Sequence, residues 1–282
     1  MPRLSLQDKQ RVQRPSLRAY LIALVMLVAI PTVTIVAVAL LRAGESYRQA
    51  SSQQLLETAN VVAQSVQSEL QARSQLIAAF ASRGLPGGTV GEELHLADSG
   101  DISTVRLRRT GDGWEVIGTP AKGVTQDHLI ETVQRRRMTV SNLIDIETDN
   151  GLVPMLALST SREIAANIFE VTTLIGNPLT LVQSLMREGT FENDMVLAVT
   201  DGTGRILARS RDAQRFIGRP APDWNALQSV NQSHGTFEAR TVDGPMVIFA
   251  FREIGDTPGW MAVTGEQLAA YNARWQQPLL VL

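Results

Sequence analysis

Two arginines, one tryptophan and one aspartate in the first half of the chain have side chains suited to holding a small charged molecule. Arg106 and Arg108 stand two positions apart in a strand-like run just before Trp114, and Asp145 lies in a later strand-like run. Because side chains alternate between the faces of a strand, both arginines are expected on one face. They could bind the carboxylate or phosphate of an anionic small molecule beside Trp114, and Asp145 could bind an amine. This is the predicted ligand-binding site; a solvent-facing basic strand, with Trp114 covering a core edge, is the alternative.

Residues for catalysis or metal binding do not occur in the required patterns. His95, His128 and His234 are isolated, without a second ligand at metal-binding spacing. The chain has no Cys, which excludes thiolate metal sites, disulfides and thiol nucleophiles. It also lacks a Gly-x-Ser-x-Gly elbow and a phosphate-binding loop. We therefore expect no catalytic residue, no metal and no cofactor in this chain.

Four more arginines cluster in the second half of the chain, around Asp212. They are Arg209, Arg211, Arg215 and Arg219. We expect them to form surface ion pairs, each worth less than about 1 kcal/mol, and ligand contacts are the alternative.

The charge of the chain is unevenly distributed. The whole sequence has 26 basic and 28 acidic residues, but residues 1–18 alone carry a net charge of +4. When these residues and Arg42 are set aside, 20 basic and 27 acidic residues remain. This acidic remainder argues against a nucleic-acid partner.

A membrane-spanning helix is predicted near the amino terminus. Residues 19–41 form a run of 23 residues without a charge. As a helix this run reaches roughly 35 Å, enough to cross a hydrocarbon core of about 30 Å. The basic residues precede it, so residues 1–18 are predicted to be a cytoplasmic tail and residues 43–275 to lie on the outer side of the membrane. A cleaved signal peptide is the alternative, although the apolar run is longer than is usual for one.

The carboxyl-terminal residues 266–282 are predicted to be an exit helix and the start of a second membrane span. Trp275 is a residue type enriched at membrane interfaces, and the last five residues are Pro, Leu, Leu, Val and Leu. The alternative is a hydrophobic tail of a soluble domain.

A long helix is predicted over residues 43–84. No Gly or Pro occurs from Glu45 to Arg83, and apolar residues recur at steps of three, four or seven. These are Leu55, Ala59, Val62, Val66, Leu70, Ile77 and Phe80. At about 1.5 Å per residue the helix is roughly 60 Å long, which suits a stalk or a helix that dimerises along this stripe.

The rest of the chain contains an internal repeat of hairpin signals. Asp-Gly or Asn-Gly pairs begin at Asp112, Asn150, Asp201 and Asp243, so equivalent pairs are 89 and 93 residues apart. The strand-like runs are 104–109, 114–119, 139–146, 153–160 and 167–175, and then 195–200, 205–210, 235–242, 246–252 and 260–264. Short helical patterns at 127–137 and 223–230 separate the hairpins. The predicted fold class is α+β, with two tandem modules, 85–187 and 188–265, each built on a five-stranded antiparallel sheet.

Several stretches of the second half resemble a known family. Residues 195–212 read MVLAVTDGTGRILARSRD, 215–220 read RFIGRP, and 258–263 read PGWMAV. They resemble the membrane-proximal half of double Cache (PAS-like) extracellular sensors, especially those of bacterial transmembrane histidine kinases of the HWE type. The opening PSLRAYLIAL at residues 15–24 is similar to the start of such proteins.

The resemblance implies a sensor of a small-molecule ligand. It also implies a homodimer, a second transmembrane helix and a cytoplasmic kinase. It further implies that the membrane is the bacterial inner membrane and that residues 43–275 lie in the periplasm. Family members that bind amino acids use a Tyr, Arg, Trp and Asp constellation in the distal module, whereas Tyr20, Tyr47 and Tyr271 all lie outside both predicted modules. A diguanylate cyclase or chemoreceptor output, and a membrane-anchored periplasmic binding module without signalling, are the alternatives.

Overall fold

The computed structural model describes residues 17–83, 94–96, 100–149, 151–182, 195–222, 224–229, 232–241 and 244–273. The chain divides between Gln49 and Ala50 into two compact units. The described part of the first unit is residues 17–49, and residues 50–273 belong to the second. Of the predicted tail (1–18) only residues 17 and 18 are described, and of the predicted exit helix and second span (266–282) only residues 266–273.

The first unit is helical throughout its described part. Helix α1 (Leu17–Arg83) continues through Pro31 without a break. The hydroxyls of Thr32 and Thr34 donate to carbonyls four residues earlier, Val28 O and Ile30 O, each at 2.8 Å. Its apolar side chains here are exposed, and by length and composition this one helix could cross a membrane.

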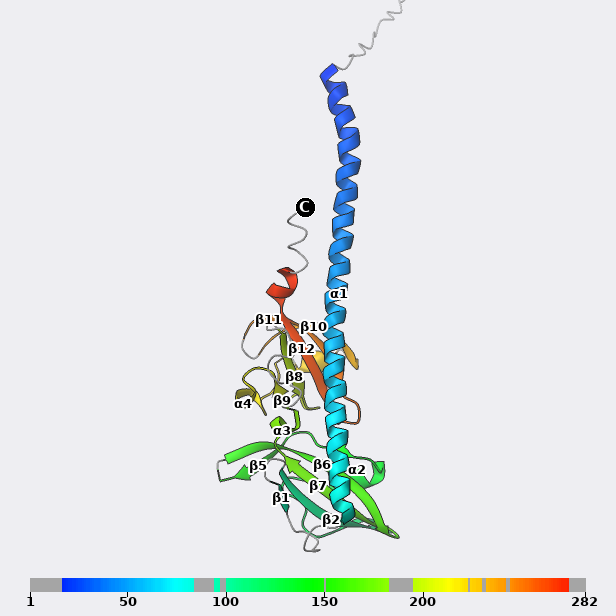
Figure 1. The fold of residues 1–282 in the computed structure, drawn as a ribbon, viewed down its shortest axis with the longest axis vertical. Helices are drawn as coiled ribbons and strands as arrows, with labels where there is room; N and C mark the ends of the chain where they lie inside the picture. The colour runs from blue at the N-terminus through cyan, green and yellow to red at the C-terminus, as the bar shows by residue number, and fades with distance from the viewer. Residues whose placement is uncertain are drawn as a thin grey trace, which may run out of the picture. The chain divides into compact units, whose positions relative to one another are not determined.

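The part of α1 in the second unit buries the predicted apolar stripe. Leu55, Val62, Val66 and Leu70 are at most 3% exposed. Val62, Val66 and Leu70 belong to one buried cluster with residues of both sheets, beside which this part of α1 runs (Figure 1). Phe80 is an exception, at 37% exposed. The stripe is therefore a core face of the protein and is not available to a partner helix.

The first sheet is antiparallel, in the order β1-β2-β7-β6-β4, with β3 paired to β2 and β5 paired to β6. Its strands are β1 (Leu94–Leu96), β2 (Gly100–Thr110), β3 (Gly113–Ile117), β4 (Thr139–Val140), β5 (Ile144–Thr148), β6 (Gly151–Ala165) and β7 (Ile168–Gly176). There are seven strands where the sequence predicts five, because β1 is added at an edge and the run 139–146 divides into β4 and β5.

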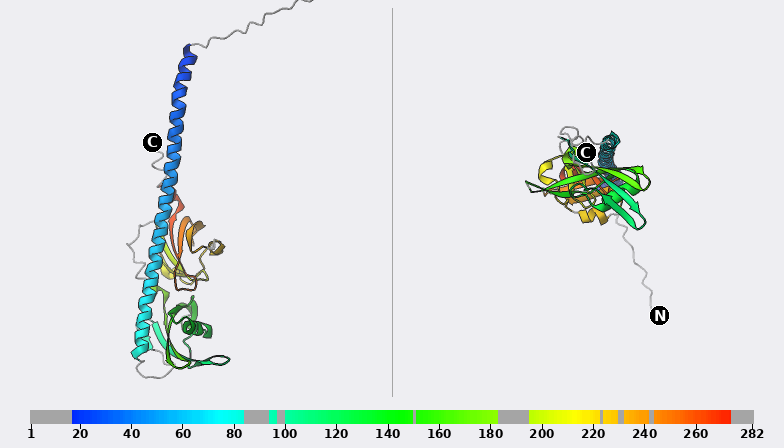
Figure 2. Two further views of the ribbon diagram at one scale, coloured as in Figure 1. Left: turned by 90° about the vertical axis from the view of Figure 1, so that its right-hand side faces the viewer. Right: turned by 90° about the horizontal axis from the view of Figure 1, so that it is seen from below.

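Helix α2 (Gln126–Arg135) covers the face of this sheet that points away from α1 (Figure 2). It starts at Thr125, whose side chain accepts a hydrogen bond from His128 N at 3.3 Å. Leu129 and Val133 lie one turn apart and pack on Val105, Leu107, Val171 and Phe169 of the sheet. Alternate residues of β2, beginning at Ile102, face α1 instead.

The second sheet is antiparallel, in the order β10-β11-β12-β8-β9. Its strands are β8 (Met195–Thr200), β9 (Ile206–Arg209), β10 (His234–Arg240), β11 (Met246–Glu253) and β12 (Met261–Gln267). Short helices α3 (Pro178–Val182), α4 (Ala213–Phe216) and α5 (Trp224–Ser229) connect the elements. The α+β fold with a long apolar helix and two antiparallel sheets is as predicted.

A buried carboxylate connects the two sheets. Asp201 is 0% exposed and accepts a hydrogen bond from Leu143 N, in the segment between β4 and β5, at 3.0 Å. Beside it, Gly202 N donates to Asn142 Oδ1 at 2.9 Å. Gly202 must lack a side chain, because a Cβ atom there would collide with Pro258 O. The predicted hairpin tip at Asp201 is thus also a junction between modules.

Candidate ligand-binding sites

The first sheet carries a polar cavity of about 520 Å³ on the face covered by α2. Its polar lining residues are Asp101, Ser103, Lys122, Glu147, Thr148 and Asp149, contributed by β2, β5, the turn after β5 and the loop before α2. Ser103 is 3% exposed, whereas Lys122, Glu147 and Asp149 are exposed. The volume falls within the range of about 300–1,000 Å³ of small-molecule sites. We call this the polar cavity.

The charges of the polar cavity suit a ligand that carries an amine. Three carboxylates face one ammonium group, that of Lys122, so the lining is net negative. An amine can pair with a carboxylate while Lys122 takes a carboxylate of the ligand. A zwitterion satisfies both requirements.

A short chain of side-chain hydrogen bonds joins β7 and β6 to α2, next to Ser103 of the polar cavity. Ser103 and Ser159 flank Thr173 across β2, β7 and β6. Ser159 Oγ lies 2.8 Å from Thr173 Oγ1 and 3.0 Å from His128 Nε2. Burial lowers the pKa of His128, which nearby Glu131 partly opposes. The lowered pKa favours the neutral ring next to the serine, and the network joins β6 and β7 to α2.

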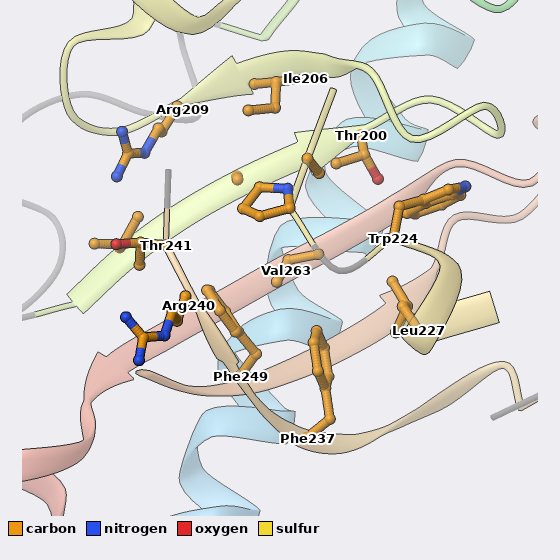
Figure 3. Close-up of a pocket in the computed structure, with 14 residues that line it drawn as sticks. Thr200, Ile206, Arg209, Trp224, Leu227, Phe237, Arg240, Thr241, Phe249 and Val263 are labelled. Carbon is orange, nitrogen blue, oxygen red and sulfur yellow. The ribbon is translucent and has the colours of Figure 1, made fainter. Parts of the chain in front are cut away.

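The second sheet carries a smaller cavity of about 70 Å³ on its face away from α1 (Figure 3). Most of its lining is apolar: Val196, Ala198, Ile206, Ala221, Pro222, Trp224, Leu227, Phe237, Phe249 and Val263. Val196 and Ala198 point into it because the alternate β8 residues Leu197 and Val199 are packed in the core with α1. We call this the apolar cavity.

A few polar groups border the apolar cavity at opposite ends. Arg209, Arg240 and Thr241 lie at one end, and Thr200 lies toward the other, near Trp224 (Figure 3). Thr200 is 3% exposed, and within the described part of the chain its Oγ1 has no hydrogen-bond partner.

Arg209 differs from the surface residue that the sequence predicts. It is 5% exposed, and its guanidinium carbon lies 4.5 Å from the centre of the Phe216 ring. The expectation that this side chain lies at the surface is therefore wrong for Arg209. The reason is that the turn after β9 folds back, so α4 brings the Phe216 ring against the guanidinium group.

The four residues of the predicted site are placed apart from both cavities. Arg106 and Arg108 do share a strand face, but each forms an ion pair within the chain. Arg106 Nε lies 3.7 Å from Glu170 Oε2. Arg108 Nη1 lies 3.2 Å from Glu115 Oε2. Trp114 makes an edge contact with Phe169, with ring centres 5.7 Å apart. Asp145 Oδ1 lies 2.6 Å from Arg205 Nη2 of the second module. None of the four lines the polar or the apolar cavity.

One signal for the polar cavity is present in the sequence. Lys9 and Lys122 are the only lysines among 26 basic residues, so Lys122 is the single lysine beyond the amino-terminal tail. Elsewhere, no three His, Asp or Glu side chains of the described residues are placed to hold a metal ion.

The sequence matches no known protein family and no curated protein. The fold, in contrast, is similar to solved structures of sensor domains. The extracellular domain of rpHK1S-Z16, assigned as a histidine kinase, has a TM-score of 0.53 at 14% identity and covers 80% of this chain and 97% of its own. The ligand-binding domain of the Pseudomonas fluorescens chemoreceptor CtaA, in complex with L-isoleucine, has a TM-score of 0.53 at 14% identity and covers 82% and 98%.

A third similar structure comes from another chemoreceptor. The periplasmic sensory domain of Campylobacter jejuni Tlp1 has a TM-score of 0.54 at 9% identity and covers 80% of this chain and 98% of its own. This chain has the Cache-like fold of extracellular sensor domains. At these identities the similarity establishes the fold alone.

Proposed function

We propose that the chain is the extracytoplasmic sensing region of a membrane-anchored receptor, with its ligand in the polar cavity. The observation that carries the proposal is this cavity, which opens on the sheet of a fold used by extracellular sensors and has carboxylates and an ammonium group on its lining. Such a receptor transmits a signal only if the ligand binds one of two arrangements more tightly than the other.

The ligand class that the polar cavity favours is a free amino acid or a similar amine. Two neighbours of comparable fold are ligand-binding domains in complexes with L-isoleucine and with GABA. Lys122 is proposed to bind the carboxylate, and Asp101 and Asp149 to bind the amine. Recognition would therefore use groups other than the tyrosine-containing constellation, which this chain lacks. The anionic site at Arg106, Arg108, Trp114 and Asp145 is the competing proposal.

The proposed topology follows the charge asymmetry of the sequence. Residues 1–18 lie in the cytoplasm, 19–41 cross the bacterial inner membrane, and 43–275 are periplasmic. In this scheme the long helix is 43–84, the membrane-distal module is 85–187 and the membrane-proximal module is 188–265. Residues 266–282 lead into a second membrane helix and a histidine kinase of the HWE type. The alternatives are the sensor region of a diguanylate cyclase or chemoreceptor, and a membrane-anchored periplasmic binding module without signalling.

A homodimer is part of the proposal. The apolar stripe of α1 is buried within the chain, so a second copy would use other residues of this helix. Val61 and Leu76 are 53% and 61% exposed on α1 and are the proposed contacts, together with Phe80, the exposed member of the stripe, one turn after Leu76.

Ligand binding can be tested on the full chain in lipid nanodiscs. We expect at least one member of a panel of the common amino acids and GABA to raise Tm by about 5 °C or more when present at 100 times its Kd. Calorimetry then gives the Kd. Lys122→Gln should weaken binding at least about tenfold, since it removes a charge-assisted hydrogen bond.

Arg108→Gln is the matched control, because it removes one basic side chain from the same module outside the cavity. Binding to this variant should stay within about twofold of wild type. Loss of binding with Arg108→Gln but not with Lys122→Gln would favour the competing anionic site. A panel without any ligand would overturn the proposal.

A further inference from the structure

Strand β5 takes part both in the polar cavity and in the junction between the two modules. Its residues 146–148 line the polar cavity. One position earlier, Asp145 makes an ion pair with the second module, in which Asp145 Oδ1 lies 2.6 Å from Arg205 Nη2. One short strand therefore carries lining residues of the cavity directly beside a residue that is bonded to the other module.

The segment just before β5 is bonded to the same turn of the second module. Leu143 N donates to Asp201 Oδ2 at 3.0 Å, and Gly202 N donates to Asn142 Oδ1 at 2.9 Å. In the opposite direction, Arg205 Nη1 donates to Leu143 O at 3.3 Å. Because donors and acceptors come from both modules, a movement of β5 along or away from its sheet would also move this turn.

Strand β5 is held less firmly within its own module than the strands beneath it. In the described part of the chain it pairs with β6 alone, outside the main path of the first sheet. None of its five residues is buried, whereas most of β7 is buried. A strand with few buried contacts can shift at a lower free energy than the core strands of the sheet.

We infer that β5 transmits ligand binding in the polar cavity to the second module. A small molecule in contact with residues 146–148 and with the opposite lining, which includes Ser103 and Lys122, restrains β5. Because β5 and the segment before it are bonded to the turn that begins at Asp201, binding restrains that turn as well. This inference rests on the function proposed above, since it requires a ligand in the polar cavity.

Hydrogen exchange of the full chain in lipid nanodiscs tests the inference. The probe is the tightest-binding member of the panel of common amino acids and GABA, at 100 times its Kd. It should slow exchange of the Thr203 and Arg205 amides at least about fivefold, because both donate to Asp201, which the first module holds through Leu143 N. Amides of β10 are the internal control and should not change, since β10 and β9 form opposite edges of the second sheet.

The double variant Asn142→Ala/Asp145→Asn weakens the connection and leaves the cavity lining in place. It removes the acceptor of Gly202 N and the charge that pairs with Arg205. Protection of the Thr203 and Arg205 amides by the probe should fall to less than about twofold. Calorimetry should still show binding, with a Kd within about tenfold of wild type, which also establishes that the variant is folded.

Glu115→Gln is the matched control for this variant. It removes an exposed ion pair with Arg108 that lies entirely within the first module, so the protection should stay at its wild-type value. Binding of the probe without slower exchange at Thr203 and Arg205 would overturn the inference and leave the ligand site intact. Full protection in the double variant would do the same, whereas a panel without any ligand would overturn both proposals.

Discussion

The polar and apolar cavities lie on corresponding faces of two similar sheets, the faces turned away from α1. On the first sheet that face carries Asp101 and Ser103, and the cavity measures about 520 Å³. On the second sheet the corresponding face carries aromatic side chains, with Phe237 and Phe249 stacked at 5.4 Å between ring centres, and only about 70 Å³ remains. Alternate residues of a few strands therefore decide whether the outer face of the same architecture carries a large polar cavity or a small, largely apolar one.

The two sheet faces that pack on α1 do not differ in this way, because both contribute to one core. Leu158 and Leu174 of the first sheet and Leu197 and Val199 of the second belong to one buried cluster with α1. One helix thus provides a common core for two modules whose outer faces differ. The comparison predicts that changes at the junction affect both modules, whereas changes in a cavity affect one.

The largest effect is expected from Asp201→Ala at the junction. Asp201 accepts hydrogen bonds from the backbone N–H groups of Leu143, Thr203 and Arg205, so its removal leaves three donors unsatisfied. At about 1–3 kcal/mol for the buried Leu143 donor and about 1 kcal/mol for each of the two part-buried hydrogen bonds, the free energy of unfolding should fall by about 3–5 kcal/mol. Urea unfolding, followed by circular dichroism and by tryptophan fluorescence, should then give transitions that no longer coincide.

Asp145→Ala is the control for this junction variant. Asp145 makes an ion pair with Arg205 but is 43% exposed, so its loss should cost less than about 1 kcal/mol. A single unshifted transition in Asp201→Ala would contradict the proposed coupling of the modules.

A smaller effect is expected from enlarging the apolar cavity with Phe249→Ala. The Phe249 ring lies across Gly265, which has no side chain to fill the space that the ring would leave. Unfolding free energy should fall by about 2–4 kcal/mol, and the larger cavity should admit benzoate. Calorimetry with benzoate checks the gain, and denaturant unfolding checks the loss.

Phe169→Ala in the first module is the matched variant. It removes a ring that packs on Trp114 and should destabilise the protein to a similar extent without admitting benzoate. Equal benzoate binding by the two variants would show that the ring at position 249 does not limit the apolar cavity.

The fold was largely predictable from local sequence signals. Helix α1 ends at Arg83, before the Gly and Pro cluster, and β8 has the predicted bounds of Met195 and Thr200. The break between β4 and β5 was not predictable, because Asn142 and Leu143 leave the sheet to bond Asp201 and Gly202, about 60 residues away. No local pattern contains such a contact.

The cavities were less accessible to sequence analysis than the fold. Alternation correctly places Arg106 and Arg108 on one face, but it does not say which face α2 covers. The structure puts Val105 and Leu107 under α2, which turns the two arginines away from the polar cavity. For the apolar cavity, the apolar lining residues are also ordinary core types, and Arg209 is buried only because the turn after β9 folds back on it.

The smallest effect is expected from protonation in the network beside the polar cavity. Burial lowers the pKa of His128 below its usual 6.5 in the folded chain, so between these two values the unfolded chain binds more protons. Stability should therefore decrease as the pH falls below about 6.5 and level off below the lowered pKa. His128→Gln, neutral throughout, should lack this decrease, so its Tm should approach that of wild type as the pH falls from about 7.5 to 5. A difference in Tm that stays constant over this range would mean that His128 does not contribute to the pH dependence. The second module has no histidine in its cavity lining, so ligand binding there should not follow this titration.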